Sequence, residues 1–547
     1  MKLANVRKPI AIVVLGALAA CGGGGGAAGT GPVLPAHKTR SQQQPILTTI
    51  VGVGDSLTAG YQSDGFLGQA NFKNPLYPGT YVPPTQENGW WALLHEQASS
   101  SPLQTAIEEV FDPATSPLPL IVGPGLDNQI VPTGISLNPI GQYKGTDPCT
   151  YDNGFNQSGF GLNASARVRM NSTSSVIRDV GIPGMTLHEA NVLHQPQTDT
   201  CSPLPGIPGL LSDVVNEESG TFWPVLRNFA NLGGNLTQVN AAASVHPTLA
   251  TLWLGANDVL KFMGSGGRFH GGDQNASQAA ADVATAIVTL KDAGAHVVVA
   301  NLPNVVQTGY FQRMTATSKT ARDCFIQSYA SCLLVHLAGI PPSVLPEIGK
   351  QYGLLTPNGC IPASVSKPCG YLTLPGTLEI IDYYGATGQL PNLDCAQPSP
   401  SCKPVQGSGL GSNYITPQFA GQVQSLNNAI NQGIQNAATA AQVPMVPILT
   451  IFTGIASGDP SNPYFKEATS IAPGVCCALG FLYGGLLSFD GIHPSDTGYA
   501  LIASAFIDAI NKAYGARVPQ VDVEAVYNGT RCKTYCYPDP YAPHASK

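Results

Sequence analysis

A serine, a carboxylate and a histidine stand in two short motifs near opposite ends of this 547-residue chain. Ser56 belongs to Gly-Asp-Ser-Leu at 54–57, directly after an apolar run that predicts a strand. Asp490 and His493 belong to Asp-Gly-Ile-His-Pro at 490–494. A carboxylate that accepts the Nδ1 proton of a histidine leaves Nε2 able to take a proton from a serine hydroxyl. Together the three residues have the chemistry of a serine nucleophile, its base and an orienting acid.

Each motif alone has an ordinary structural explanation. Gly, Asp and Ser are common turn residues, so the 54–57 motif could be a simple turn. The second motif could be the start of a helix that carries a surface histidine, with Pro494 in the first turn. The interpretation as a reactive site depends on finding both motifs, and further polar groups, on the same predicted sheet.

Two more polar motifs follow expected strands. Gly184 lies in Gly-Ile-Pro-Gly-Met-Thr at 181–186, and Asn257 lies in Gly-Ala-Asn-Asp at 255–258. A tetrahedral intermediate with a negative oxygen needs two or three fixed hydrogen-bond donors. The Ser56 amide, the Gly184 amide and the Asn257 side chain could form such an oxyanion hole, although each motif could also be a plain turn.

The four motifs, in this order, resemble those of the SGNH (GDSL) hydrolase superfamily. The resemblance assigns the family's serine, glycine, asparagine and histidine to Ser56, Gly184, Asn257 and His493, and its aspartate to Asp490. It implies a carboxylic ester hydrolase of the esterase or lipase type, which acts through an acyl-enzyme on Ser56 and needs no cofactor. Asn-Leu-Pro at 301–303 also looks like a family feature, but one without a catalytic group.

The chain departs from the family in the spacing of its motifs. The serine and glycine motifs are farther apart than usual, and so are Asn257 and Asp490. We expect the additional segments to shape the cleft and so to decide the substrate. Asp55 belongs to the serine motif but is expected to brace the turn rather than to join the triad. Alternatives with the same residues are a polysaccharide or peptidoglycan O-acetyl esterase and an acyltransferase; a more remote one is a non-catalytic binding lipoprotein.

Apolar periodicity places the motifs on an α/β fold. Continuous apolar runs that alternate with amphipathic helices indicate a parallel sheet covered on both faces. With the resemblance, this predicts a three-layer α/β/α, flavodoxin-like domain at 45–515, with loop-rich, disulfide-stapled insertions at about 66–172 and 310–412. The expected strands are 47–53, 175–180, 249–254, 296–301 and 443–451, and the expected helices are 279–292, 417–441, 496–514 and one that opens at 88–94.

The first residues have the pattern of an export signal. A basic head precedes an apolar run that is too short to span a bilayer and that ends in Leu-Ala-Ala-Cys at 18–21. This resembles a bacterial lipobox, which implies a signal peptide at 1–20, a lipid on Cys21 and a Gly-rich tether at 21–44. We therefore expect an exported protein anchored to the cell envelope, at the outer membrane. A secretory signal with a chance cysteine, and an untethered enzyme, is the alternative.

The cysteines agree with an oxidising compartment. Of 13 cysteines, 12 remain beside Cys21, an even number. Zinc fits the spacings poorly. The tentative disulfides are Cys149–Cys201, Cys324–Cys332, Cys360–Cys369 and Cys395–Cys402, with the pairing of Cys476, Cys477, Cys532 and Cys536 left open. The last two of these lie in a C-terminal extension at 516–547.

Composition limits the partners. Only 11% of the residues are charged, the formal net charge is −7, and no basic run is present. Nucleic acid is therefore not expected as a partner. The expected partners are an ester substrate and, through Cys21, a membrane; the chain is expected to be a monomer without a metal. His188-Glu189 resembles the start of a zinc protease motif, but the second histidine is misplaced.

Overall fold

The structure is a computed structural model, and several parts of the chain are described in it. The described residues are 44–62, 86–112, 114–122, 130–131, 134–135, 168–169, 176–192, 225–226, 236–264, 275–313, 334–335, 339–354, 360–361, 363–391, 393, 413–457, 486–488, 491–533, 536 and 539. The expected signal peptide, Cys21, the tether and most of the first expected insertion lie outside these residues.

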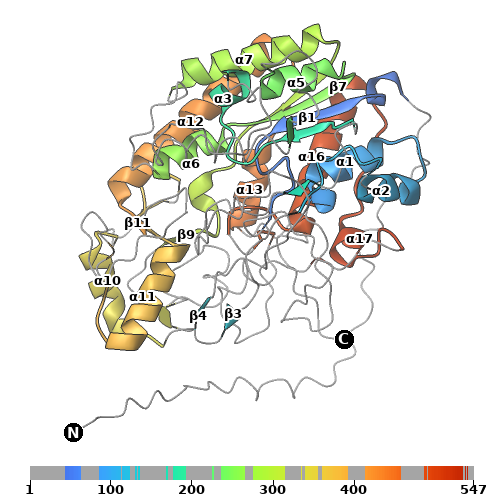
Figure 1. Cartoon of the computed structure of the whole chain (residues 1–547). Coiled ribbons are helices and arrows are strands. Elements are labelled where there is room, and N and C mark those ends of the chain that lie inside the picture. Colours follow the sequence, from blue (N-terminus) through green and yellow to red (C-terminus); the bar gives the residue numbers. More distant parts are fainter. Residues whose placement is uncertain are drawn as a thin grey trace, which may run out of the picture.

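A five-stranded sheet forms the centre of the molecule (Figure 1). All its pairings are parallel. The strands stand in the order β12 (Met445–Val446), β8 (His296–Ala300), β7 (Leu249–Trp253), β1 (Ile50–Gly54), β6 (Asp179–Gly181). After β1 the chain adds β6 on one side of it, and then adds β7, β8 and β12 in turn on the other side. The direction of winding therefore reverses between β1 and β7. In open α/β sheets, ligands bind at the carboxyl ends of the strands at such a reversal.

Helices lie on both sides of this sheet (Figure 1). In one group, α7 (Ala276–Asp292) packs against α3 (Leu187–Val192), α5 (Gln238–Ser244) and α12 (Pro417–Ala440). In the other, α1 (Trp90–Ala98) packs against α2 (Leu103–Phe111) and α16 (Asp496–Tyr514), and α16 against α17 (Val523–Tyr527). The predicted α/β class, with a parallel central sheet and accompanying helices, is confirmed.

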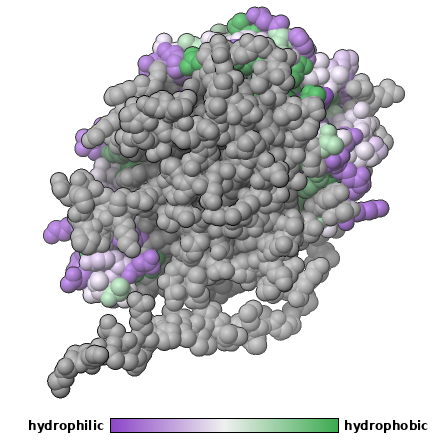
Figure 2. All heavy atoms as spheres, viewed as in Figure 1, coloured by the Kyte–Doolittle hydropathy of each residue, from purple (hydrophilic) through white to green (hydrophobic). Residues whose placement is uncertain are grey.

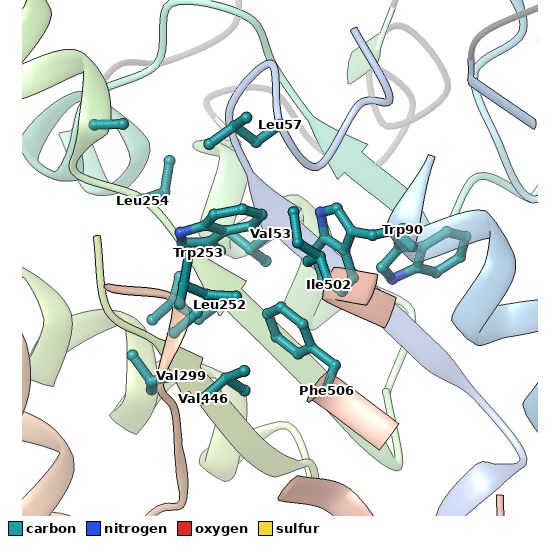
Figure 3. Packing of buried hydrophobic residues seen from close by; sticks show 14 of the residues in the cluster. Val53, Leu57, Trp90, Leu252, Trp253, Leu254, Val299, Val446, Ile502 and Phe506 are labelled. Atoms are coloured by element: carbon teal, nitrogen blue, oxygen red, sulfur yellow. The ribbon is translucent and has the colours of Figure 1, made fainter. Parts of the chain in front are cut away.

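Aromatic residues fill the layer between the sheet and the α1–α16 pair. Trp90 stacks on Phe506 with ring centroids 4.0 Å apart, and its edge meets Trp253 of β7 at 5.9 Å. Figure 3 shows these rings packed with Val53 and Ile502. Because burial of apolar surface is the main stabilising term in folding, this cluster fixes α16, and with it the chain just before α16, against the central strands.

One expected strand is wrong in part. The apolar run 443–451 forms a strand only at β12, and from Ile448 it is helical, as α13 (Ile448–Ser457). Pro447 is the physical reason, since proline has no N–H for a strand ladder and suits a helix start. Its carbonyl accepts from Thr450 and Ile451, which opens the helix. The strand expected at 175–180 is also shorter and begins later, at Asp179.

A second, antiparallel sheet stands apart from the central one. It consists of β9 (Phe311–Arg313), β10 (Tyr371–Thr373) and β11 (Tyr414–Ile415). With α10 (Leu345–Gln351) and α11 (Leu374–Thr387) it encloses a separate hydrophobic cluster. The described part of the expected second insertion is therefore outside the central sheet, as expected, but it is more regular than a loop-rich segment.

Short elements complete the described chain. They are the strand pairs β2 (Ile121–Val122) with β5 (Val168–Arg169) and β3 (Ile130–Val131) with β4 (Gly134–Ile135), the helix α6 (Ala256–Gly264), and the 3-10 turns η1 (Pro45–Leu47), η2 (Gln86–Asn88), η5 (Val305–Gln307) and η7 (Pro342–Val344).

Two disulfides are present among the described cysteines. Cys360–Cys369 was predicted and is confirmed. Cys532 pairs with Cys536, which resolves half of the group whose pairing the sequence left open. The remaining cysteines lie outside the described residues: Cys21, Cys149, Cys201, Cys324, Cys332, Cys395, Cys402, Cys476 and Cys477.

The described surface is mixed in polarity. Figure 2 shows hydrophilic and hydrophobic residues side by side along the visible edge of the described part. Exposed valines such as Val192 and Val288 come from different helices. Among the described helices, none combines the length and the hydropathy that crossing a membrane requires.

Buried carboxyl groups make stability depend on pH. Burial raises the pKa of Asp179 to about 8, although the N–H of Gly181 opposes the rise. Burial likewise raises the pKa of Glu87 to about 8. In the unfolded chain these groups lose their protons near pH 4. The folded state therefore binds more protons than the unfolded state in this window, and stability is lost as the pH rises from about 4 to about 8.

We expect the free energy of unfolding to fall between pH 6.5 and pH 8, on the order of 1 kcal/mol per pH unit for each group. Burial lowers the pKa of His95 to about 4, so the folded state holds His95 neutral; the unfolded chain still protonates it in part near pH 6.5, which opposes the fall by only about 0.4 kcal/mol over this window. Urea unfolding of Asp179→Asn should show a smaller pH slope. The exposed Asp292→Asn serves as control, and equal slopes in all three proteins would contradict the expectation.

Candidate active site

The serine turn begins where β1 ends. The carbonyl of Asp55 accepts from Thr58 N (3.1 Å) and Ala59 N (3.0 Å), while its side chain accepts from Leu57 N at 2.9 Å. Gly54 is required by space, since a Cβ there would lie 1.9 Å from Thr58 Oγ1. The buried Asp55 thus braces a tight turn, as predicted, and Ser56 is left half-buried at the carboxyl edge of the sheet.

Burial raises the pKa of Asp55 to about 7. The Leu57 N–H and the nearby His493 partly oppose this rise, because both favour the charged carboxylate. The Asp55 carboxyl is therefore close to half-protonated at neutral pH. This agrees with a structural role for Asp55 in the turn rather than with a permanently charged partner of the histidine.

His493 lies against the serine. Its Nε2 is 2.9 Å from Ser56 Oγ, although the two residues are 437 positions apart in the chain. This is a hydrogen-bond distance for a hydroxyl that donates to a neutral imidazole. The aromatic ring of Tyr61 packs against the imidazole, with centroids 4.8 Å apart and planes at 56°.

A hydrogen-bonded loop carries His493. Ser488 N donates to the His493 carbonyl at 2.7 Å, and Ser495 N donates to the Leu486 carbonyl at 3.0 Å. Gly491 has φ 71° and its carbonyl accepts from Tyr310 N at 2.9 Å; a Cβ on Gly491 would lie 2.7 Å from that nitrogen. Only glycine combines this left-handed backbone with so close an approach.

The helix after the loop starts at Asp496, as predicted, but Pro494 is not part of its first turn. Ser495 is the N-cap of α16, with its side chain accepting from Gly498 N, so Pro494 precedes the cap instead of standing in the first turn. Asp490, the expected orienting carboxylate, lies outside the described residues, and its position relative to His493 remains a prediction.

The two expected oxyanion motifs meet next to each other. Gly184 is half-buried, with φ 82°, in the turn after β6. Asn257 stands in the first turn of α6, after β7, and its Nδ2 donates to the Met185 carbonyl at 3.1 Å. One position on, Asp258 accepts from Leu187 N at 3.1 Å. These bonds tie the Gly184 turn to the start of α6 across the end of β1.

A second set of polar contacts reinforces this connection at the surface. Lys261 Nζ of α6 contacts both carboxylate oxygens of Glu189 of α3, at 2.6 and 2.7 Å, and Glu189 also accepts from Thr186 N at 3.0 Å.

His188 is the histidine closest in sequence to Gly184. It faces Asp282 of α7, with Nδ1 3.2 Å from the carboxylate. His188 is not among the residues that line the pocket at Ser56.

A pocket opens beside Ser56. Polar groups of Ser56, Asn257 and His493 share it with apolar side chains that include Leu260, Val305 and Phe452. Gly184 does not line it, so the pocket extends from the serine toward α6 and α13 rather than toward β6. The arrangement offers a hydroxyl next to an imidazole at one end of an apolar cavity.

Two residues outside the serine, glycine, asparagine and histidine motifs also shape the site. Gln238 of α5 donates through Nε2 to the carbonyls of Gly54 and Val180, which joins the ends of β1 and β6. Asn301 Oδ1 accepts from Leu449 N at 2.9 Å and so anchors α13, which brings Phe452 to the pocket. The sequence singled out Asn301 in its Asn-Leu-Pro motif, but the other contacts depend on the folded chain.

Among the described residues, no group of three or more His, Cys, Asp or Glu side chains is arranged to hold a metal ion.

Comparisons with known proteins add no assignment. No protein-family model, curated protein or solved structure matches this chain.

Proposed function

We propose that the chain is a serine ester hydrolase that forms an acyl-enzyme on Ser56. The observation that carries this proposal is the 2.9 Å distance between Ser56 Oγ and His493 Nε2, at the edge of a parallel sheet where the winding reverses. The order of the serine, glycine, asparagine and histidine motifs, together with the strand order, supports membership of the SGNH hydrolase superfamily and its three-layer fold.

In this proposal the histidine moves one proton in each half of the reaction. Ser56 Oγ attacks the acyl carbon and His493 Nε2 takes the hydroxyl proton. The negative oxygen is held by the N–H groups of Ser56 and Gly184 and by the Asn257 amide. His493 then gives its proton to the departing alcohol. A water molecule then attacks the acyl carbon while His493 Nε2 takes its proton; the bond to Ser56 Oγ breaks, the acid leaves, and His493 returns the proton to Ser56 Oγ. Asp490 would orient the imidazole, a role that rests on its sequence spacing.

The proposed location of the enzyme is the bacterial cell envelope. The Leu-Ala-Ala-Cys sequence supports lipid attachment at Cys21 and anchoring to a bacterial cell envelope, at the outer membrane. Retention of a Cys21→Ala variant in the membrane fraction, at the level of the native chain, would overturn this part of the proposal and leave the chemistry untouched.

A series of p-nitrophenyl esters from acetyl to palmitoyl tests the activity on the full chain in detergent. We expect turnover of at least part of the series, with a burst of p-nitrophenol when deacylation is slow. Product analysis with added alcohols and with O-acetylated glycans distinguishes water from another acyl acceptor and an acetyl ester from longer ones. No turnover of any ester, with correctly folded protein, would contradict the proposal.

A further inference from the structure

The C-terminal extension returns to the core next to the histidine loop. After α16 the chain forms α17, which packs on α16 (Figure 1). It then presents Arg531, the disulfide Cys532–Cys536 and Asp539. Both charged residues contact buried groups that the proposed mechanism does not use, and both sets of contacts lead to the first turn of α16, shortly after His493.

Arg531 enters the core as a buried cation. Its guanidinium forms an ion pair with Glu96 of α1, and the two side chains are only 6% and 1% exposed. It also donates to Asn88 Oδ1 at 2.7 Å and to the Glu87 carbonyl at 3.3 Å. Removing the cation would leave a buried carboxylate unpaired, which is strongly destabilising, so the arginine ties the last turn of α1 at Glu96 to the η2 turn that precedes the helix.

Asn88 connects Arg531 to residues that pack near His493. Its Nδ2 donates to Asp496 Oδ2 at 3.1 Å, and Gln62 Nε2 donates to Asp496 Oδ1 at 2.8 Å. Gln62 directly follows Tyr61, whose ring packs on His493. Tyr499 of α16 donates to the Tyr61 carbonyl at 2.7 Å. The network therefore fixes the aromatic surface against which the imidazole rests.

Asp539 binds the residue next to Asp496 in the first turn of α16. One of its carboxylate oxygens accepts from Thr497 N at 2.8 Å and from Thr497 Oγ1 at 2.5 Å. Thr497 lies in the first turn of α16, four residues after His493, and Asp539 is fully buried. The disulfide Cys532–Cys536 closes the chain between Arg531 and Asp539, so it limits the positions that these two side chains can take relative to each other.

We propose that the C-terminal extension is a disulfide-closed clamp that positions His493 against Ser56, with Arg531 and Asp539 as its positioning residues. The inference rests on the proposed function and deepens it, because neither residue touches the reacting atoms. Arg531 acts through Asn88 on Asp496, which also binds Gln62 beside Tyr61, and Asp539 acts on Thr497. Asp496 and Thr497 are adjacent in the first turn of α16, so both residues fix the helix start that follows His493.

Three variants of the full chain test the clamp: Arg531→Met, Asp539→Ala and the double Cys532→Ser/Cys536→Ser. Each is expected to lower kcat by about tenfold to a hundredfold while KM changes little, since a small displacement of the base slows chemistry more than binding. Asp539→Asn keeps an acceptor for Thr497 and should recover most of the activity. Matched controls are Arg517→Met, an exposed arginine of the same extension, and Cys360→Ser/Cys369→Ser, the disulfide just before β10 of the second sheet.

A measurement without turnover separates this inference from the proposed function. With ¹⁵N-labelled histidine, the imidazole resonances of His493, identified by their loss in His493→Gln, should move in Asp539→Ala and in the Cys532/Cys536 variant but not in the controls. Activity and resonances equal to those of the controls would overturn the clamp. Absence of ester turnover in the native chain, with the resonances still shifting, would overturn the function and leave the clamp in place.

Discussion

Replacing Ser56 by alanine is expected to lower kcat for a p-nitrophenyl ester by about 10⁴-fold to 10⁶-fold, to the level that binding and the oxyanion donors alone provide. The fold should persist, because Ser56 is half-buried and the turn is held by backbone and side-chain bonds of Asp55. Stopped assays at high enzyme concentration measure the residual rate, and thermal unfolding measures stability.

A matched control for this variant is Ser244→Ala, which removes another half-buried serine hydroxyl, one that donates to the Ala241 carbonyl at 2.7 Å in α5 and does not line the pocket. It should cost about 1 kcal/mol in stability but retain most of the catalysis. If Ser56→Ala kept a tenth or more of the native rate, the nucleophile would be another residue and the Ser56–His493 contact would be structural.

Replacing Asn257 by alanine is expected to give the second largest loss, about 10²-fold to 10³-fold in kcat, the usual effect of removing one oxyanion donor. Asn257 lines the same pocket as Ser56 and His493, so its amide is placed to donate to a substrate oxygen. KM should change little if the donor acts mainly in the transition state. Steady-state kinetics on one well-hydrolysed ester measure both constants.

Asn191→Ala is the matched control for Asn257. Asn191 also donates through Nδ2 to backbone carbonyls, those of Leu187 and Asp282, but from α3 and away from the pocket. A loss of kcat in Asn191→Ala as large as in Asn257→Ala would show that the effect comes from loosening α3 and its neighbours, not from a lost donor.

The sequence predicted the elements whose signals are local. Period-3.6 apolar patterns placed α12 and α16 within one residue of their observed ends, because one buried stripe per helix is written into the chain itself. The serine turn was predicted for a similar reason, as an apolar strand followed by turn residues. The run 443–451 was misjudged because a short apolar stretch fits a strand and a buried helix equally well, and Pro447 was not given its full weight.

The supports of the site could not be predicted from local patterns. Gln238 bonds the ends of two strands, and Arg531 pairs with Glu96 across 435 positions of the chain. Neither position has a distinguishing neighbourhood in the sequence, since such contacts are chosen by tertiary packing. The motif residues Ser56 and His493 were found because the proposed reaction demands their types, whereas a supporting residue can be of any type that fits.

Activation of Ser56 by His493 is the central requirement of the proposed function. Labelling with a fluorophosphonate, followed by peptide mass spectrometry, tests it directly on the native chain. We predict one adduct, on Ser56, whose formation slows at least about a hundredfold in His493→Ala and stops when the protein is unfolded before labelling. An adduct on another serine, or labelling of Ser56 at the same rate without His493, would contradict the account.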